Sequence, residues 1–138
     1  YTISASERDF ILATWPDIWN LEGTAYRAFK TGQQPSNASP VYRFWSAANR
    51  VHFYTISAAE RDQIIANWGY IWSYEGIAFY AHKKTGAPAG TFPVYRFWSS
   101  KLKKHFYTIS EAEKSSIINN WGATWAYEGI AWYAYKPN

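Results

Sequence analysis

Residues 41–60 read VYRFWSAANRVHFYTISAAE, and residues 94–113 repeat them as VYRFWSSKLKKHFYTISEAE. Tyr1, Tyr54 and Tyr107 each open the string Y-T-I-S, so the repeat has a period of 53 residues. A unit this short cannot bury its own apolar face, and repeated units stack on a shared core. We therefore expect a single domain of three repeats over residues 1–138.

The three repeats are unequal in length. The repeats at 41–93 and 94–138 are full, whereas the repeat at 1–40 is incomplete and lacks the first strand, the counterpart of residues 41–53. The string P-V-Y-R-F-W-S accordingly occurs twice, at 40–46 and 93–99. An open sheet edge invites pairing with another strand. Three explanations are open at this point: the N-terminus is trimmed, the first repeat is short, or a second copy of the chain supplies the strand. The last would make a homo-oligomer.

Each full repeat is predicted to hold a hairpin, a short helix and a bent strand. Residues 41–45 and 52–56 alternate in polarity and are rich in aromatic and β-branched residues, which is typical of paired strands. Ser57 and Glu60 carry the capping-box signature, in which the serine hydroxyl binds the glutamate amide and the carboxylate binds the serine amide. Residues 72–81 follow as one bent strand or two short ones, with Gly76 at a bend or bulge.

The end of the predicted helix is marked by tryptophan and glycine. Trp68 lies on the apolar stripe of the helix, so we expect it and its counterparts Trp15 and Trp121 in the core. Gly69 and Gly122 follow at the C′ position, where a left-handed residue commonly ends a helix.

These elements predict a mainly β fold with one short helix in each repeat. The strands carry large apolar groups on both faces, as strands packed between two layers do. We expect a pseudo-threefold, three-bladed, propeller-like ring. The alternative is a β-trefoil-like fold, which also has three repeats, but with four strands in each and no capped helix.

Aromatic residues make up 21% of the chain, with 12 Tyr, 9 Trp and 8 Phe. A domain of this size cannot easily bury so many rings, so some are expected at the surface, where they can stack on a ligand. The chain has no cysteine, which excludes disulfides and thiolate metal sites. No apolar run approaches the ~20 residues of a membrane-spanning helix, so membrane insertion is not expected.

The recurring polar residues do not form a catalytic or metal-binding pattern. Glu22, Glu75 and Glu128 recur without a second carboxylate beside them, and His52 and His105 recur without a nucleophile motif or a metal-ligand partner. We therefore predict no enzyme, no metal and no cofactor. The net charge of +4 and one basic turn, Lys101 to Lys104, do not indicate a nucleic-acid partner.

The strings V-Y-R-F-W, H-F-Y-T and Y-E-G together resemble a family of tandem Tyr/Trp-rich repeats in secreted bacterial and fungal proteins. The resemblance covers nearly the whole chain. It implies an extracellular accessory or lectin-like domain, often appended to a hydrolase. It supplies no set of binding residues, so the candidates below rest on the residues of this sequence.

Carbohydrate is the ligand class that the composition favours. Sugar rings stack on aromatic faces, and their hydroxyls need fixed polar partners. We predict a secreted, non-catalytic module that binds glycans at two or three equivalent sites. The alternative is a structural or protein-binding repeat domain appended to a secreted hydrolase, with its rings in the core and its arginines in ion pairs. The candidate ligand-binding residues are Trp19, Trp72, Trp125, Glu22, Glu75, Glu128, Tyr74, Tyr127, Arg43, Arg96, His52 and His105.

Overall fold

The computed structural model describes residues 4–14 and 25–137. The first repeat contributes the helix α1 (Ala5–Thr14). The second repeat contains β1 (Ser39–Ser46), β2 (Val51–Thr55), α2 (Ala58–Asn67) and β3 (Ser73–Ala81). The third contains β4 (Phe92–Ser99), β5 (Lys104–Thr108), α3 (Glu111–Asn120) and β6 (Ala126–Ala134). The predicted order of hairpin, helix and bent strand is thus confirmed in both.

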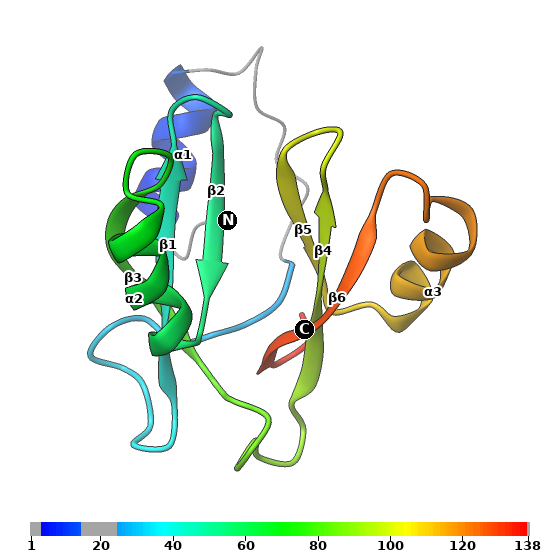
Figure 1. The fold of residues 1–138 in the computed structure, drawn as a ribbon. Helices are drawn as coiled ribbons and strands as arrows, with labels where there is room; N and C mark the ends of the chain where they lie inside the picture. The colour runs from blue at the N-terminus through cyan, green and yellow to red at the C-terminus, as the bar shows by residue number, and fades with distance from the viewer. Residues whose placement is uncertain (1–3, 15–24, 138) are drawn as a thin grey trace.

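The two full repeats each form a three-stranded antiparallel sheet, with the strand orders β2-β1-β3 and β5-β4-β6. The V-Y-R-F-W strand lies at the centre of each sheet because it pairs with both the hairpin partner and the strand after the helix. The two sheets stand side by side, with α2 and α3 on opposite flanks (Figure 1). The mainly β class and the one helix per repeat are therefore confirmed, and the described strands form no closed barrel.

The strand after each helix bends at a glycine, as predicted. Gly76 lies opposite Arg43 with φ +92°, and Gly129 lies opposite Arg96 with φ +100°. The register of each pair shifts on both sides of this point, which marks a β-bulge. Glycine adopts this φ without a Cβ clash. The bulge turns the glutamate that precedes the glycine towards the arginine of the central strand.

Three isolated backbone bridges connect the repeats in a cycle. They join Phe29 with Tyr80, His82 with Tyr133, and Tyr135 with Arg27. Each bridge has two N–H···O bonds of 2.7–3.0 Å. The bridges therefore link the first repeat to the second, the second to the third, and the third to the first.

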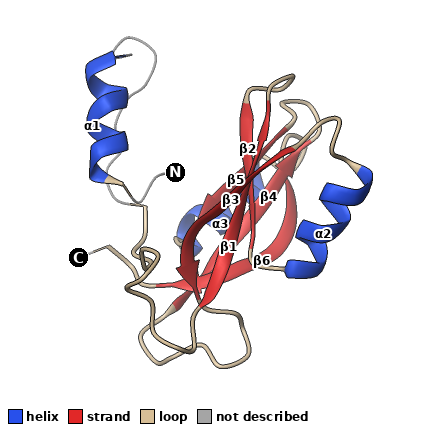
Figure 2. Ribbon diagram, turned by 90° about the vertical axis from the view of Figure 1, so that its left-hand side faces the viewer, coloured by secondary structure: helices blue, strands red, loops and turns tan. Residues whose placement is uncertain are grey.

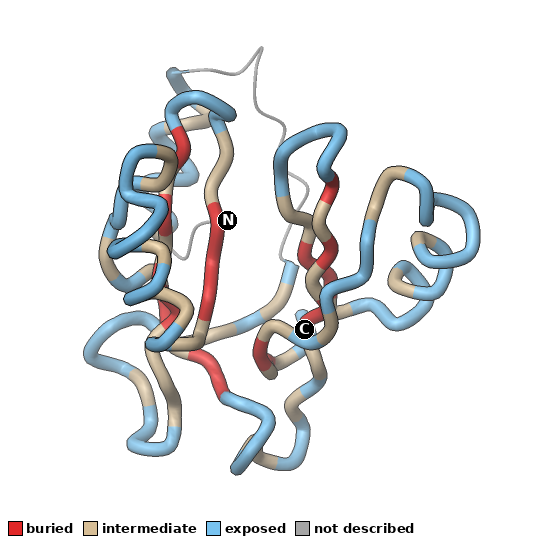
Figure 3. Tube along the Cα trace, in the orientation of Figure 1, coloured by how far each residue is buried: buried red, intermediate tan, exposed pale blue. Residues whose placement is uncertain are grey.

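Two triangles of rings follow the same period of 53. Tyr26, Phe79 and Trp132 lie edge to face, with centroids 5.6–6.2 Å apart. A second triangle, with centroids 5.9–6.3 Å apart, comprises Phe29, His82 and Tyr135. Edge-to-face contact is the geometry that aromatic quadrupoles favour. The first triangle belongs to the main core, and the buried segments lie along the strands (Figure 3).

The helices are more exposed than the sequence predicted. No residue of α1, α2 or α3 is buried, and α1 projects away from the two sheets (Figure 2). Trp68 is 47% exposed and Trp121 59%, so the expectation that both lie in the core was wrong. Trp15 lies outside the described residues.

The glycines after these tryptophans do not form left-handed caps. Neither Gly69 nor Gly122 has a positive φ, and the C-cap residue is the tryptophan itself. A Cβ on Gly69 would instead lie 3.2 Å from the carbonyl oxygen of Ile65, and the same holds for Gly122 and Ile118. Glycine is therefore favoured there by the close approach of the preceding helical turn.

Candidate functional site

An arginine, a glutamate and a histidine converge in each full repeat. In the second repeat, Arg43 Nε and His52 Nε2 both lie 3.0 Å from Glu75 Oε1. The three side chains come from the central strand β1, its hairpin partner β2 and the bulged strand β3. They are brought together by the bulge at Gly76.

The third repeat builds the same cluster. Arg96 Nε lies 3.0 Å and His105 Nε2 3.1 Å from Glu128 Oε1. The ring of His105 packs against Trp98, with centroids 4.7 Å apart, as His52 packs against Trp45 in the second repeat. These contacts hold the imidazole with Nε2 directed at the carboxylate.

The clusters change the proton affinities of their members. Burial by itself raises the pKa of Glu128, but the hydrogen bond from His105 and the charge of Arg96 outweigh it and lower the pKa below its usual 4.5. Burial lowers the pKa of His52 below its usual 6.5, although the negative charge of Glu75 acts to raise it. Glu128 is therefore ionised at neutral pH, and His52 is neutral.

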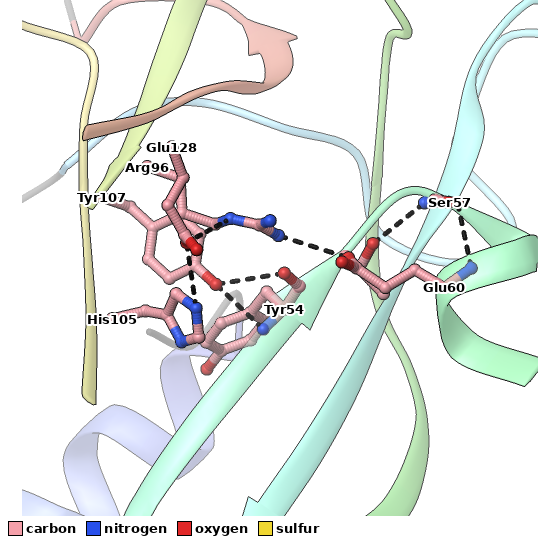
Figure 4. Close-up of polar contacts among 8 residues, drawn as sticks. Tyr54, Ser57, Glu60, Arg96, His105, Tyr107 and Glu128 are labelled. Atoms are coloured by element: carbon pink, nitrogen blue, oxygen red, sulfur yellow. Dashed lines mark hydrogen bonds and ion pairs between the residues drawn. The ribbon is translucent and has the colours of Figure 1, made fainter. Parts of the chain in front are cut away.

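A second carboxylate reaches Arg96 from the neighbouring repeat. Glu60 Oε1, on α2, lies 3.2 Å from Arg96 Nη1 (Figure 4). Arg96 is therefore held between carboxylates of two repeats. Burial alone would lower its pKa, but the neighbouring Tyr107, Glu60 and Glu128 outweigh this and raise it. The guanidinium is charged at every pH of interest.

Glu60 is available for this contact because the capping box is only half formed. The Ser57 hydroxyl accepts from the Glu60 amide at 3.1 Å, as predicted. The Ser57 amide, however, donates to Thr55 Oγ1 at 3.1 Å, so the expected bond to the Glu60 carboxylate is replaced. The threonine of Y-T-I-S thus takes over that half of the cap, and the carboxylate points to the next repeat.

A groove of about 590 Å³ lies where the two full repeats meet. Three tryptophans line it, Trp68 and Trp72 from the second repeat and Trp98 from the third. The other lining residues are Asn49, Phe53, Glu60, Ile64, Ile71, Arg96, Lys103, His105 and Glu128. A smaller hollow of about 240 Å³ shares Glu60, Arg96 and Glu128 with the groove. The ion-paired cluster is therefore accessible from two cavities.

Four of the predicted site residues meet in this groove, namely Trp72, Arg96, His105 and Glu128. The tryptophan comes from the second repeat, and the three polar residues come from the third. The matching cluster of Arg43, His52 and Glu75 lies in the second repeat. Trp19 and Glu22 lie outside the described residues.

Three other predicted site residues, two tyrosines and one tryptophan, lie outside the groove. Tyr74 packs against Tyr42 and Phe44, with centroids 6.3 and 5.2 Å away, on the face of the sheet opposite Arg43. Tyr127 makes the same contacts with Tyr95 and Phe97. Trp125 packs on Phe106 at 5.9 Å. None of the three lines the groove.

Glu60, Trp68 and Trp98 line the groove but were not among the predicted site residues. Glu60 was assigned to the helix cap and Trp68 to the core. Thr55 could have indicated the role of Glu60. A hydroxyl two residues before the capping serine can accept from the amide of that serine, and the Glu60 carboxylate is then free for another contact. Among the residues that the structure describes, no group of three His, Asp or Glu is placed to hold a metal ion. No described helix is long and apolar enough to span a bilayer.

Residues 1–135 match the model of a domain of unknown function, DUF5648, and the chain belongs to that family. No curated protein and no solved structure matches the chain significantly. The family has no described activity, so the groove is the feature of this chain from which a function can be inferred.

Proposed function

We propose that the chain is a non-catalytic, lectin-like module that binds carbohydrate in the groove between adjacent repeats. The observation that carries this proposal is a hollow of about 590 Å³ lined by three tryptophans and an ion-paired polar cluster. Pockets for small ligands are mostly apolar with a few fixed polar groups, and the face of a sugar ring stacks on indole.

The polar residues of the groove are held in place before any ligand arrives. Arg96 is held by Glu60 and Glu128, and Glu128 is also bound by His105. A binding site whose side chains are already ordered loses less conformational entropy when a ligand binds. Weak but specific contacts to sugar hydroxyls are thereby favoured.

The ring-like arrangement belongs to the same proposal. The cycle of three bridges and the two ring triangles support a pseudo-threefold, propeller-like closure with a groove between successive repeats. Sites repeated around such a ring raise the avidity for a polysaccharide. Action outside the cell follows from the likeness to secreted repeat proteins and is part of the proposal.

The state of the carboxylates supports binding over catalysis. Glycoside hydrolysis needs a protonated carboxylic acid near neutral pH and a second carboxylate. Glu60 and Glu128 do share the groove, but both pair with Arg96, and the pKa of Glu128 is lowered. A lowered pKa makes Glu128 unsuited to be the proton donor that the reaction requires.

One observation favours a second function, a purely structural or protein-binding repeat domain. The contact between Arg96 and Glu60 joins two repeats, so it contributes to assembly whether or not a ligand binds. On this alternative the tryptophans of the groove serve only packing or protein contacts.

A glycan array followed by tryptophan fluorescence titration separates the two functions. We expect at least one glycan to bind and to change the emission, and Trp68→Ala to weaken binding tenfold or more without unfolding the chain. Trp121→Ala removes the same indole one repeat later and outside this groove, so it should leave the affinity of this groove unchanged and at most reduce the number of sites. Absence of binding to every glycan would exclude the lectin proposal.

A further inference from the structure

The charges that line the groove cancel. Its lining contains two carboxylates, Glu60 and Glu128, and two cations, Arg96 and Lys103. Arg96 is compensated within the groove, because it contacts one carboxylate through Nε and the other through Nη1. An anionic ligand would therefore find Arg96 already paired and would approach two carboxylates.

Each of these carboxylates keeps one oxygen for a ligand. In the described part of the chain, the ion pairs of Glu60 with Arg96 and of Glu128 with Arg96 and His105 are made through Oε1, which leaves Oε2 to face a ligand. The Glu60 and Glu128 side chains are 35% and 31% exposed, so solvent reaches them. An ionised carboxylate only accepts hydrogen bonds, and sugar hydroxyls are suitable donors.

We propose that the groove selects an uncharged sugar whose hydroxyls donate to Glu60 of the second repeat and to Glu128 of the third. This inference rests on the proposed function and names the ligand class of the same groove. The sugar ring stacks on the tryptophans, and its hydroxyls bridge two repeats. Hydrogen bonds to ionised acceptors are stronger than neutral ones, so they compensate better for the lost hydration of the hydroxyls.

The basic β4–β5 turn, in contrast, would favour an acidic sugar. Lys101, Lys103 and Lys104 are exposed there, and Lys103 also lines the groove. Contact with these lysines would favour sulfated or carboxylated glycans and would weaken as salt screens the charges. We favour the uncharged sugar because the lysines lie on a turn, whereas the carboxylates are ordered by Arg96.

The first experiment is a glycan array of neutral and acidic oligosaccharides, read at 20 and 300 mM NaCl. Each hit is then compared with a partner of similar structure and different charge, such as lactose with sialyllactose, or methyl-esterified with free oligogalacturonate. We expect neutral glycans to bind, with an affinity that changes less than twofold with salt. Binding of acidic glycans alone, lost tenfold or more at high salt, would overturn this inference and leave the lectin proposal standing. Binding of no glycan would overturn both.

The second experiment uses Glu60→Gln, which keeps the shape of the side chain and removes its charge. We expect about tenfold weaker binding of the neutral glycan, the effect of weakening one hydrogen bond to a charged group. We also expect tighter binding of the acidic partner glycan, because Arg96 loses one of its two carboxylates. Glu113→Gln is the matched control at the same position of the third repeat, where the side chain is exposed.

A purely structural role for Glu60 would change the affinity for both glycans by the same factor. A thermal melt of each variant verifies that it is folded. The inference would be contradicted if Glu60→Gln bound the neutral glycan within twofold of the affinity of the parent chain. An equal loss of affinity for both glycans would also contradict it.

Discussion

The hydroxyl oxygen of Tyr107 lies 3.0 Å from both the backbone nitrogen and the carbonyl oxygen of Tyr54, the residue at the same position one repeat earlier. Tyr54 lies on β2, and both of these backbone groups are satisfied by the hydroxyl of the next repeat. The two rings also meet edge to face, with centroids 5.8 Å apart. The tyrosine of Y-T-I-S is therefore an inter-repeat link.

Tyr107→Phe removes this link while keeping the ring. We expect the free energy of unfolding to fall by about 1–3 kcal/mol, because a buried N–H and C=O lose their partner. Urea denaturation measures the change. Tyr70→Phe is the control, since Tyr70 is 79% exposed, and its effect should stay within about 0.5 kcal/mol. Equal, small effects of the two variants would show that the hydroxyl contributes nothing.

Alkaline pH should destabilise the chain through Tyr54. Burial raises the pKa of its hydroxyl to about 12 from an ordinary 10. A group whose pKa is raised on folding stabilises the fold fully below its unfolded pKa and loses this effect as pH rises through its folded pKa. Stability should therefore decline between pH 10 and 12. Circular dichroism of Tyr54→Phe should show a shallower decline, and an unchanged slope would contradict the assignment.

Acid should weaken the cluster in the third repeat. The pKa of Glu128 is lowered, so its contribution to stability is present above 4.5 and is lost as pH falls through the lower, folded value. The difference in unfolding free energy between the parent chain and Glu128→Gln should shrink from pH 7 to pH 3. The control Glu113→Gln should show a small difference at both pH values. A constant gap for Glu128→Gln would contradict the lowered pKa.

The contact between repeats can be measured by a double-mutant cycle. Glu60→Gln and Arg96→Gln, made singly and together, should give a coupling of about 1 kcal/mol, as expected for a partly exposed ion pair. Thermal or urea denaturation provides the four free energies. Full additivity would mean that the two repeats do not interact through this pair.

The sequence was sufficient to predict the repeat, the strand order along the chain and the bulge. Period-2 alternation at 41–45 and 52–56 reports side chains on two faces of a strand, and Gly76 marks the bend because other residues adopt its φ poorly. These are local signals. They do not depend on how the repeats pack against each other.

The groove could not be predicted in the same way, because it forms between repeats. Trp72 and Glu75 were predicted as site residues of the same repeat, whereas packing places Trp72 in a groove with Glu128, in the next repeat. Glu60 was hidden for another reason, since its spacing from Ser57 fits a capping box, and only the competing bond from the Ser57 amide to Thr55 releases it. The groove therefore depends on non-local contacts, whereas the release of Glu60 depends on a local hydrogen bond that competes with the capping box.

The central claim is that sugar binds in the groove between the second and third repeats. The most direct measurement is a titration of the ¹⁵N-labelled chain with the tightest-binding oligosaccharide, following the nine tryptophan indole N–H signals by NMR. We predict shifts of Trp68, Trp72 and Trp98, which line the groove, and little change for Trp132, which is 1% exposed. Unchanged signals of Trp68, Trp72 and Trp98, or shifts confined to Trp121 and Trp125, would contradict the claim.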